Sequence, residues 1–403
     1  MDSFSKDNTI NAIKGVVKSE KMVTIIIYIL LVLVIILLFS WIGSVITKEK
    51  RNCIKMDNLY ESKESITLEP LPFNLDNHPL RDFYIKTAYN CCSAGNFKNS
   101  FVNTCALQNC IKQGARCLDF EIYSIDNKPV IATSSLNNCT IKETYNSVSF
   151  ESAMEMVKDY AFDNTVTPTY ESPMILHFRM MNCPQDTLLF TSMATTLKEI
   201  FEAANPSYLM GPTYSYEYRV NDTDSDSPPH HMNFGEVHIG LMRKKVVIIV
   251  DKITPAIEAS PLYEMINMGG DYFFRNQTPS DLKQAESVEA EVNNNKLHMT
   301  FLKPELSAEP TNLDFSIYRR FGIQFIGMCF QNFDRNLEFC DLFFQTEGIN
   351  TNSANSKGGS AFILKPESMI YTPTYLDPPI KQDPANSYAP RVYTTDLGID
   401  IIH

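Results

Sequence analysis

Two pairs of adjacent side chains have chemistry of their own. His230 and His231 stand together, with His238 soon after, and neutral imidazoles are ligands for transition metals. No ligand spacing on a regular element supports a metal site there, so we interpret this polar stretch as a solvated loop. Cys91 and Cys92 are candidate nucleophiles, but no histidine lies nearby in the sequence to accept a thiol proton. Neither pair alone defines an active site.

The overall charge limits the classes of partner. The 403 residues include 47 acidic and 35 basic side chains, which gives a formal net charge of −12. Nucleic-acid binding requires a basic surface that displaces counterions, so this class is excluded. The same charge opposes adhesion of the whole chain to anionic lipid. Contact with a membrane must therefore come from a local feature.

An apolar run supplies that feature. Residues 22–47 contain no charged side chain and consist mostly of Ile, Leu, Val and Phe, with Trp41 near one end. A helix needs about 20 such residues to cross the hydrocarbon, and tryptophan is common at the interface. A signal peptide fits less well, because the run is too long and no small-residue cleavage site follows it. We predict a polar tail over residues 1–21, then a single span that binds the lipid bilayer.

The side of the membrane stays open. Basic residues flank both ends of the span, so the positive-inside rule does not separate them: Lys6, Lys14, Lys18 and Lys21 precede it, and Lys48, Lys50, Arg51 and Lys55 follow it. The ten cysteines are compatible with disulfides in an oxidising compartment, with no pairing specified. Glycosylation sequons begin at Asn138, Asn221 and Asn276, and such tripeptides are common by chance.

Apolar strand-like runs alternate with amphipathic stretches from about Asp82 onward. The strand-like runs are Phe83–Thr87, Cys117–Tyr123, Pro129–Ala132, Met174–Phe178 and Val246–Val250, and the helix-like stretches are Thr104–Gln113, Phe150–Ala161 and Thr187–Ala204. Alternating strands and helices indicate a parallel sheet, and this many units predict a closed α/β barrel.

Several motifs resemble the X half of eukaryotic phosphoinositide-specific phospholipase C. Residues 83–90 read FYIKTAYN, and residues 113–121 read QGARCLDFE. In that family, a strand ending in Ser-His-Asn-Thr-Tyr precedes a Gly-Cys-Arg-Cys-(Val/Leu)-Glu-Leu-Asp strand. Residues 129–131 and 173–176 resemble two further strands of that half. The resemblance implies a TIM-type (β/α) barrel.

The Y half is also similar. Residues 320–333 resemble its Gly-Cys-Gln-(Met/Ile)-Val-Ala-Leu-Asn-Phe strand, and residues 358–367 follow its Asn-Gly-Gly-x-x-Gly-Tyr-x-Leu-Lys-Pro run. The domain organisation that we predict is a tail (1–21), a transmembrane helix (22–47), a charged spacer (48–76), an X-like half-barrel (77–253), a Y-like half-barrel (254–372) and a C-terminal tail (373–403). The tail ends in a stretch that resembles the first strand of the family's C2 domain, expected to pack on the barrel or to be disordered.

Both proton-transfer positions of the family are altered. The resemblance places its two catalytic histidines at Tyr89 and Thr133. A phenol with a pKa of about 10 is a poor general acid–base at neutral pH, and threonine does not titrate usefully. Each loss should lower the rate roughly 10²–10⁴-fold.

The metal site implied by the resemblance is altered at one position. Asn90, Asp119 and Glu121 keep three positions of the family's calcium ligands, while Arg179 replaces the fourth, a glutamate. An inward Arg179 would repel calcium and pair with Asp119 or Glu121; an outward one would be a surface residue. Alternation along the strand favours the inward direction. His177 lies two residues earlier, and a lone histidine is more often packing than catalytic.

The substrate-binding positions are also altered. The family's phosphate-binding lysines fall near Ile249 and Asp251, and its Arg-x-Tyr-Pro motif aligns with residues 301–304. We therefore predict a catalytically inactive, membrane-anchored barrel with a structural or interaction role and no cofactor. A virion membrane is one setting compatible with such a chain. The alternatives are a divergent phosphoric diester hydrolase, which would need calcium, and a non-catalytic binder of lipid headgroups.

Overall fold

The computed structural model describes residues 3–61, 68–136, 141–181, 186–221, 230–270, 272–346, 359–373, 392–394 and 400–402. Residues 1–370 form one compact unit and residues 371–403 a second one. Two of the ten cysteines, Cys139 and Cys183, lie outside the described residues, as does the sequon asparagine Asn138.

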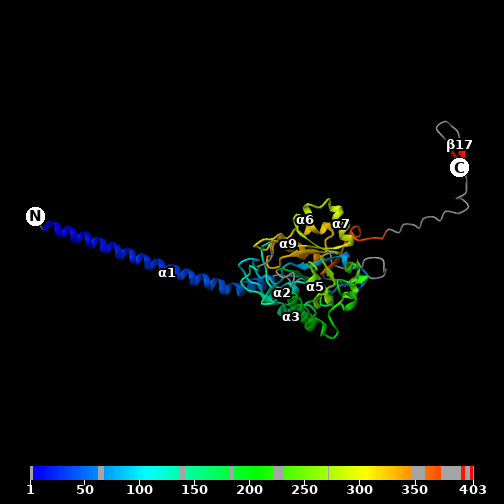
Figure 1. Cartoon of the computed structure of the whole chain (residues 1–403), viewed down its shortest axis with the longest axis horizontal. Coiled ribbons are helices and arrows are strands. Elements are labelled where there is room, and N and C mark those ends of the chain that lie inside the picture. The colour runs from blue at the N-terminus through cyan, green and yellow to red at the C-terminus, as the bar shows by residue number, and fades with distance from the viewer. Residues whose placement is uncertain are drawn as a thin grey trace. The chain divides into compact units, whose positions relative to one another are not determined.

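A long helix, α1 (Ser3–Glu61), contains the predicted span (Figure 1). The part from Lys21 onward is apolar enough and long enough to cross a membrane. The helix does not stop at the end of the apolar run: it continues through the first part of the predicted charged spacer, because Met56 and Tyr60 on its last turns are buried against the barrel. The sequence analysis predicted neither this continuation nor its packing.

Polar and covalent contacts hold the end of α1 on the barrel. A disulfide joins Cys53 to Cys105 at the start of α2 (Thr104–Lys112). One turn later, the Asn109 amide donates to the carboxylate of Asp57 over 2.7 Å, and the Tyr60 hydroxyl donates to a barrel carbonyl. This end of the helix is therefore part of the folded unit.

The core of the first unit is a parallel sheet that curves into a nearly closed barrel. The strand order is β10-β9-β6-β3-β2-β13-β12-β11, and every neighbouring pair on this path is parallel. The bounds are β2 (Phe83–Ala88), β3 (Cys117–Ile125), β6 (Met174–Met180), β9 (Val246–Val250), β10 (Met268–Gly269), β11 (Phe274–Gln277), β12 (Met299–Leu302) and β13 (Phe325–Met328). Among the described residues, no pairing joins β10 to β11.

Short strands extend this sheet. β4 (Lys128–Ile131) is antiparallel to β3 and pairs with β5 (Val148–Ser149), while β15 (Phe362–Leu364) is antiparallel to β2. β1 (Leu68–Glu69) and β14 (Gly359–Ser360) form a separate, parallel two-stranded sheet.

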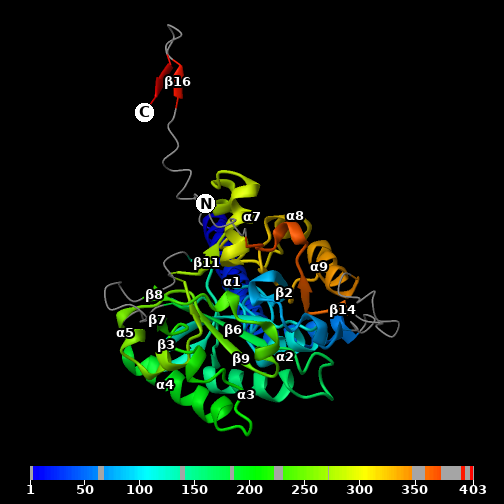
Figure 2. The same ribbon diagram turned by 90° about the vertical axis from the view of Figure 1, so that its right-hand side faces the viewer.

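Helices surround the sheet (Figure 2). Besides α2, they are α3 (Phe150–Ala161), α4 (Thr187–Leu197), α5 (Pro255–Glu258), α6 (Pro279–Lys283), α7 (Val288–Leu297), α8 (Phe315–Tyr318) and α9 (Arg335–Thr346). Side chains of Asn103, Ser149 and Asp186 cap the first backbone amides of α2, α3 and α4. The TIM-type α/β fold predicted from the sequence is confirmed.

The second unit contains a short antiparallel pair of strands. Its last strand, β17 (Asp400–Ile402), which was expected to pack on the barrel or to be disordered, pairs with β16 (Val392–Thr394) in the same unit. This pairing was not predicted. An edge strand needs a partner for its backbone amides, and β16 provides it.

Candidate functional site

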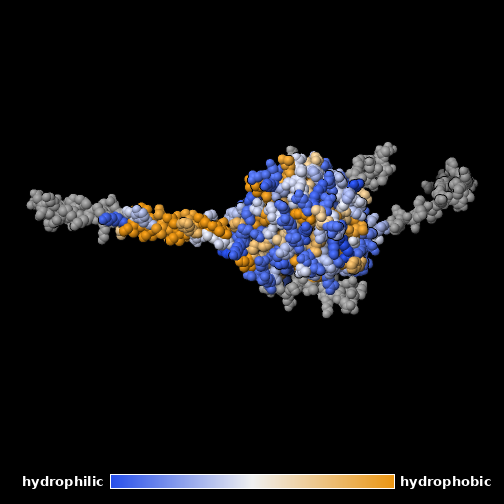
Figure 3. Space-filling view, turned by 90° about the horizontal axis from the view of Figure 1, so that it is seen from below, coloured by the Kyte–Doolittle hydropathy of each residue, from blue (hydrophilic) through white to orange (hydrophobic). Residues whose placement is uncertain are grey.

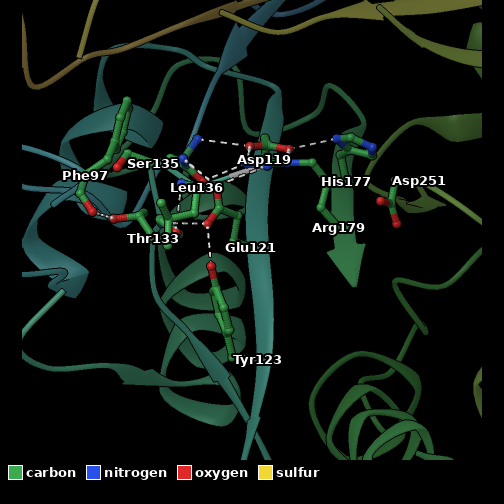
Figure 4. Close-up of polar contacts among 12 residues, drawn as sticks. Phe97, Asp119, Glu121, Tyr123, Thr133, Ser135, Leu136, His177, Arg179 and Asp251 are labelled. Carbon is green, nitrogen blue, oxygen red and sulfur yellow. Dashed lines mark hydrogen bonds and ion pairs between the residues drawn. The ribbon is translucent and has the colours of Figure 1, made fainter. Parts of the chain in front are cut away.

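Two neighbouring strands bring the predicted site residues together. β3 and β6 are in register, so Asp119 lies opposite His177, and Glu121 lies opposite Arg179. Residues two apart on a strand share a face, and these four side chains meet on the inner face of the barrel (Figure 4). The inward direction that we predicted for Arg179 is the one observed.

The Arg179 guanidinium lies at the centre of the acidic cluster. Its Nε donates to Oδ1 of Asp119 over 2.9 Å, and its Nη2 donates to Oδ2 over 2.8 Å, which makes a bidentate pair. Its Nη1 donates to Glu121 Oε1 over 3.1 Å, and its Nη2 also donates to the side-chain oxygen of Asn90 over 2.8 Å. One cation therefore connects all three residues that were predicted as remnants of a metal site.

Other donors occupy the remaining carboxylate positions. Asn90 donates its backbone N–H to Asp119 Oδ2 over 3.1 Å and its side-chain amide to Glu121 Oε1 over 3.0 Å. It does so from a positive φ of 45°, which asparagine tolerates better than most residues. Glu121 Oε2 accepts from the Tyr123 hydroxyl and from the backbone N–H of Ser134, each over 3.0 Å. Each carboxylate oxygen of the pair thus accepts two hydrogen bonds.

The cluster is closed to solvent. Asp119 and Glu121 have no exposed surface, and Arg179 is 3% exposed. Burial by itself would raise the pKa of Asp119, but the charge of Arg179 and the hydrogen bond from His177 hold that pKa well below its usual range. Burial likewise opposes charge on Arg179, but Asp119, Tyr89 and Glu121 raise its pKa well above the ordinary value. Both directions favour the ionised forms of Asp119 and Arg179.

The donor set does not fit a calcium ion. Calcium takes six to eight oxygen ligands, several of them from carboxylates, and needs those oxygens free. Here the carboxylate oxygens accept hydrogen bonds from Arg179 and its neighbours, and a fixed positive charge lies among them. Within the described part of the chain, no group of three or more acidic, histidine or cysteine side chains could hold a metal ion.

Tyr89 and Thr133 are packed rather than poised for proton transfer. The Arg179 guanidinium lies 4.8 Å from the centre of the Tyr89 ring, a cation–π contact, and this ring meets Phe97 edge to face. Burial raises the pKa of Tyr89 far above its ordinary value. Thr133 is buried, and its hydroxyl donates to the Phe97 carbonyl over 2.9 Å.

His177 has a partner that the sequence analysis missed. Its Nδ1 lies 2.8 Å from Asp119 Oδ1; since the carboxylate only accepts, Nδ1 is the donor. Nε2 has no hydrogen-bond partner among the described residues. The ring packs against Phe301 and Phe274, with centroids 4.5 and 5.3 Å away, and has no exposed surface. Only the register between β3 and β6, which a single sequence does not reveal, makes this pair.

The positions aligned with substrate-binding residues carry no basic cluster. Ile249 is fully buried in β9, and the carboxylate of Asp251 accepts from the backbone N–H of Met180 over 3.2 Å. Burial raises the pKa of Asp251. Phe301 and Leu302 are core residues of β12. Buried apolar side chains and one carboxylate, with Lys303 as the one basic residue among these aligned positions, offer little to a phosphorylated inositol.

The remaining candidates from the sequence, the cysteine pair and the histidine pair, lie in structural positions. Burial raises the pKa of the Cys91 thiol well above its ordinary value, and Cys92 is also buried, so neither resembles a reactive thiolate. His230 and His231 form β8 (His230–His231), paired with β7 (Val220–Asn221), where an irregular loop was predicted. His231 packs on Tyr272, with centroids 4.6 Å apart.

Comparisons with known proteins agree with this fold. Residues 76–208 match the family described as phosphatidylinositol-specific phospholipase C, X domain. The solved structure of PLC21 from L. pealei is 17% identical, with a TM-score of 0.52 over 73% of this chain and 38% of that one. PLC21 from S. officinalis is also 17% identical, with a TM-score of 0.54 over 75% of this chain and 39% of that one. No curated protein sequence matches.

These matches have a definite extent. The family match ends well before the second half of the barrel, so the Y-like assignment stays a prediction, whereas the barrel fold itself extends through both halves. The chain spans about two fifths of the length of the two PLC21 chains. Residues 76–208 are therefore similar to the X domain of phosphatidylinositol-specific phospholipase C, and the chain shares the barrel fold of the two PLC21 structures.

Proposed function

We propose that this chain is a catalytically inactive phospholipase C-like barrel, which α1 holds at a membrane for a structural or binding role. The observation that carries the proposal is the position of Arg179: its guanidinium fills the place among Asp119, Glu121 and Asn90 where the family resemblance puts calcium. With the metal position taken by a side chain, phosphate charge has no counter-ion at the barrel mouth.

The proton-transfer positions support the same proposal. Cleavage of a phosphodiester with an attacking hydroxyl needs a base for that hydroxyl and an acid for the leaving group. A phenol with a strongly raised pKa and a threonine hydroxyl bonded to a carbonyl perform neither task at neutral pH.

Calcium binding and turnover test the proposal. We expect purified protein to show no calcium-dependent shift in melting temperature, no terbium luminescence and no release of phosphorylated inositol. Arg179→Glu, which restores an acid at that position, should lower stability without calcium and regain part of it when calcium is added. Arg179→Gln is the control, since it removes the charge without adding a ligand. A micromolar calcium site in the unaltered protein would contradict the proposal.

A divergent phosphoric diester hydrolase is the second candidate. The hydrogen-bonded Asp119–His177 pair favours it, because a carboxylate that orients an imidazole is a common arrangement of a general base. The full burial of His177 weighs against it. Turnover that falls on both Glu121→Ala and His177→Gln would establish this candidate in place of the first.

The disulfide supports an orientation for the anchor. Cys53 lies six residues after the apolar run, and disulfides persist in oxidising compartments. We therefore place the barrel on the oxidising side of the membrane. Labelling of intact vesicles with an impermeant maleimide, before and after reduction, tests this. Cysteines at positions 53 and 105 that react without prior reduction would contradict it.

A further inference from the structure

The apolar segment of α1 ends close to the barrel (Figure 3). A groove lies there between the last turns of the helix and the rim of the barrel. Two cavities of about 370 and 520 Å³ form it, and both are lined by Lys48, Asn52 and Lys55. These residues are four and three positions apart, so they lie on one stripe of the helix. The opposite wall of the smaller cavity includes Gln331 and Asn332, which follow β13.

The charge of the groove is opposite to that of the whole chain. Lys48 donates to the carbonyl of Asn99 over 2.7 Å, and Arg51 donates to the carbonyl of Ser44 over 2.8 Å. Neither cation, nor Lys55, forms an ion pair within the described part of the chain.

One carboxylate, that of Glu309, lines the groove. Three cationic side chains therefore face one acid. The amides of Asn52, Gln331 and Asn332 add neutral hydrogen-bonding groups. Such a set suits a phosphate with hydroxyl groups attached.

The groove is continuous with the apolar face of the helix. Trp41 and Val45 line the larger cavity at its outer end, about two turns and one turn before Lys48, respectively. Trp41 is 63% exposed, and most other large apolar side chains of this segment are exposed too. Acyl chains packed along Trp41 and Val45 would bring a phosphate to Lys48 and Lys55.

We infer that this groove binds the headgroup of an anionic phospholipid in the leaflet next to the barrel. The phosphate lies between Lys48 and Lys55, the polar part of the headgroup meets Gln331 and Asn332, and the chains follow Trp41 and Val45. The inference rests on the proposed membrane anchor. It does not use the buried Arg179 cluster, and it assigns lipid binding to a site outside the barrel mouth.

The single tryptophan of the chain, Trp41, makes the test direct. The full chain is reconstituted into vesicles that contain either phosphatidylglycerol or phosphatidylcholine with brominated acyl chains, which quench nearby tryptophan. We expect stronger quenching by brominated phosphatidylglycerol at equal mole fraction. Lys48→Gln and Lys55→Gln should each reduce this preference roughly tenfold, because each variant loses a charge-assisted hydrogen bond to the phosphate in the groove.

Lys50→Gln is the matched control: Lys50 is exposed on the same part of α1 but does not line the groove, so the preference should remain. Unchanged melting temperatures show that the variants are folded. Equal quenching by both lipids, with insertion intact, would overturn the inference alone. Loss of the preference on addition of millimolar inorganic phosphate would overturn it too, in favour of a soluble phosphate ligand. No quenching by either lipid would instead refute the membrane anchor.

Discussion

The acidic cluster inside the barrel and the groove beside α1 differ in whether their charged side chains are paired within the chain. In the cluster, two carboxylates and one guanidinium satisfy one another, and solvent does not reach them. In the groove, Lys48 and Arg51 donate to carbonyl oxygens, and neither of them nor Lys55 forms an ion pair with another residue that the structure describes. The first arrangement is complete by itself, whereas the second is suited to an anion from outside the chain.

The difference separates binding from stability. Buried charges that have lost one partner destabilise a protein strongly, whereas exposed charges contribute little to folding. A chain that keeps an acidic cluster through an internal arginine therefore keeps a structural core, and binding is left to the exposed cations.

Removing one partner inside the cluster should have the largest effect. Asp119→Asn leaves the Arg179 charge buried with less compensation, so we expect a loss of roughly 3–5 kcal/mol in the free energy of unfolding, measured by urea denaturation. The control is Glu264→Gln, which breaks the exposed ion pair with Lys198 and should lose less than about 1 kcal/mol. Equal losses for both variants would remove the basis for the comparison.

Breaking the link between α1 and the barrel should have the next largest effect. Cys53→Ser opens the disulfide to Cys105, which has a sequence separation of 52 residues. Chain entropy predicts a loss of about 4 kcal/mol, and measured losses are often nearer 2 kcal/mol. Non-reducing gels and thermal denaturation measure it. Because the disulfide positions the groove wall, lipid preference should fall in this variant; an unchanged preference would show that the noncovalent contacts are sufficient.

Acid should destabilise the cluster before it affects the groove. The folded-state pKa of Asp119 lies below its ordinary value of 3.8, so its stabilising contribution is fully present above that pH. The contribution is then lost as the pH falls from 3.8 toward the folded-state value. Urea denaturation between pH 5 and pH 3 should show a steeper fall for the unaltered protein than for Asp119→Asn. Parallel curves would mean that Asp119 does not carry this linkage.

The smallest effect on folding should come from the groove. Lys48→Gln combined with Lys55→Gln should change the free energy of unfolding by no more than about 1 kcal/mol. Neither lysine forms an ion pair among the described residues, so the loss is limited to the hydrogen bond from half-buried Lys48 to the Asn99 carbonyl. The same double variant is the one expected to lose lipid preference. A large loss of stability would show that the lysines support the docking of α1 rather than an external anion.

The sequence predicted the parts of the fold that have a long, clear pattern. The buried runs of β3, β6 and β9 and the amphipathic helices α2 and α3 lie where they were predicted. The short strands β11 and β12 were missed because a few apolar residues do not distinguish a strand from a loop. Helix α7 was missed because, of its residues, only Asn295 is buried, which leaves no apolar stripe.

Only those residues of the candidate site that lie in recognisable family motifs could be predicted from the sequence. Family spacing and strand alternation predicted an inward Arg179 paired with Asp119 or Glu121, and it pairs with both. The partner of His177 required the register of two strands 58 residues apart. The groove required both the continuation of α1 and the choice of Cys53 and Cys105 among ten cysteines, and only tertiary packing fixes these.

If α1 is the membrane anchor proposed above, its unbroken course from the apolar segment to Glu61 also determines how the barrel is held relative to the membrane. The 14 residues after Thr47 rise about 21 Å as a helix, and their last turns are fixed to the barrel by a disulfide and buried side chains. A flexible linker would let the barrel sample many heights and tilts, whereas a docked helix transmits its own tilt and rotation to the barrel. For a chain anchored in this way, a change in bilayer thickness that alters the tilt of the helix would alter the orientation of the barrel with it.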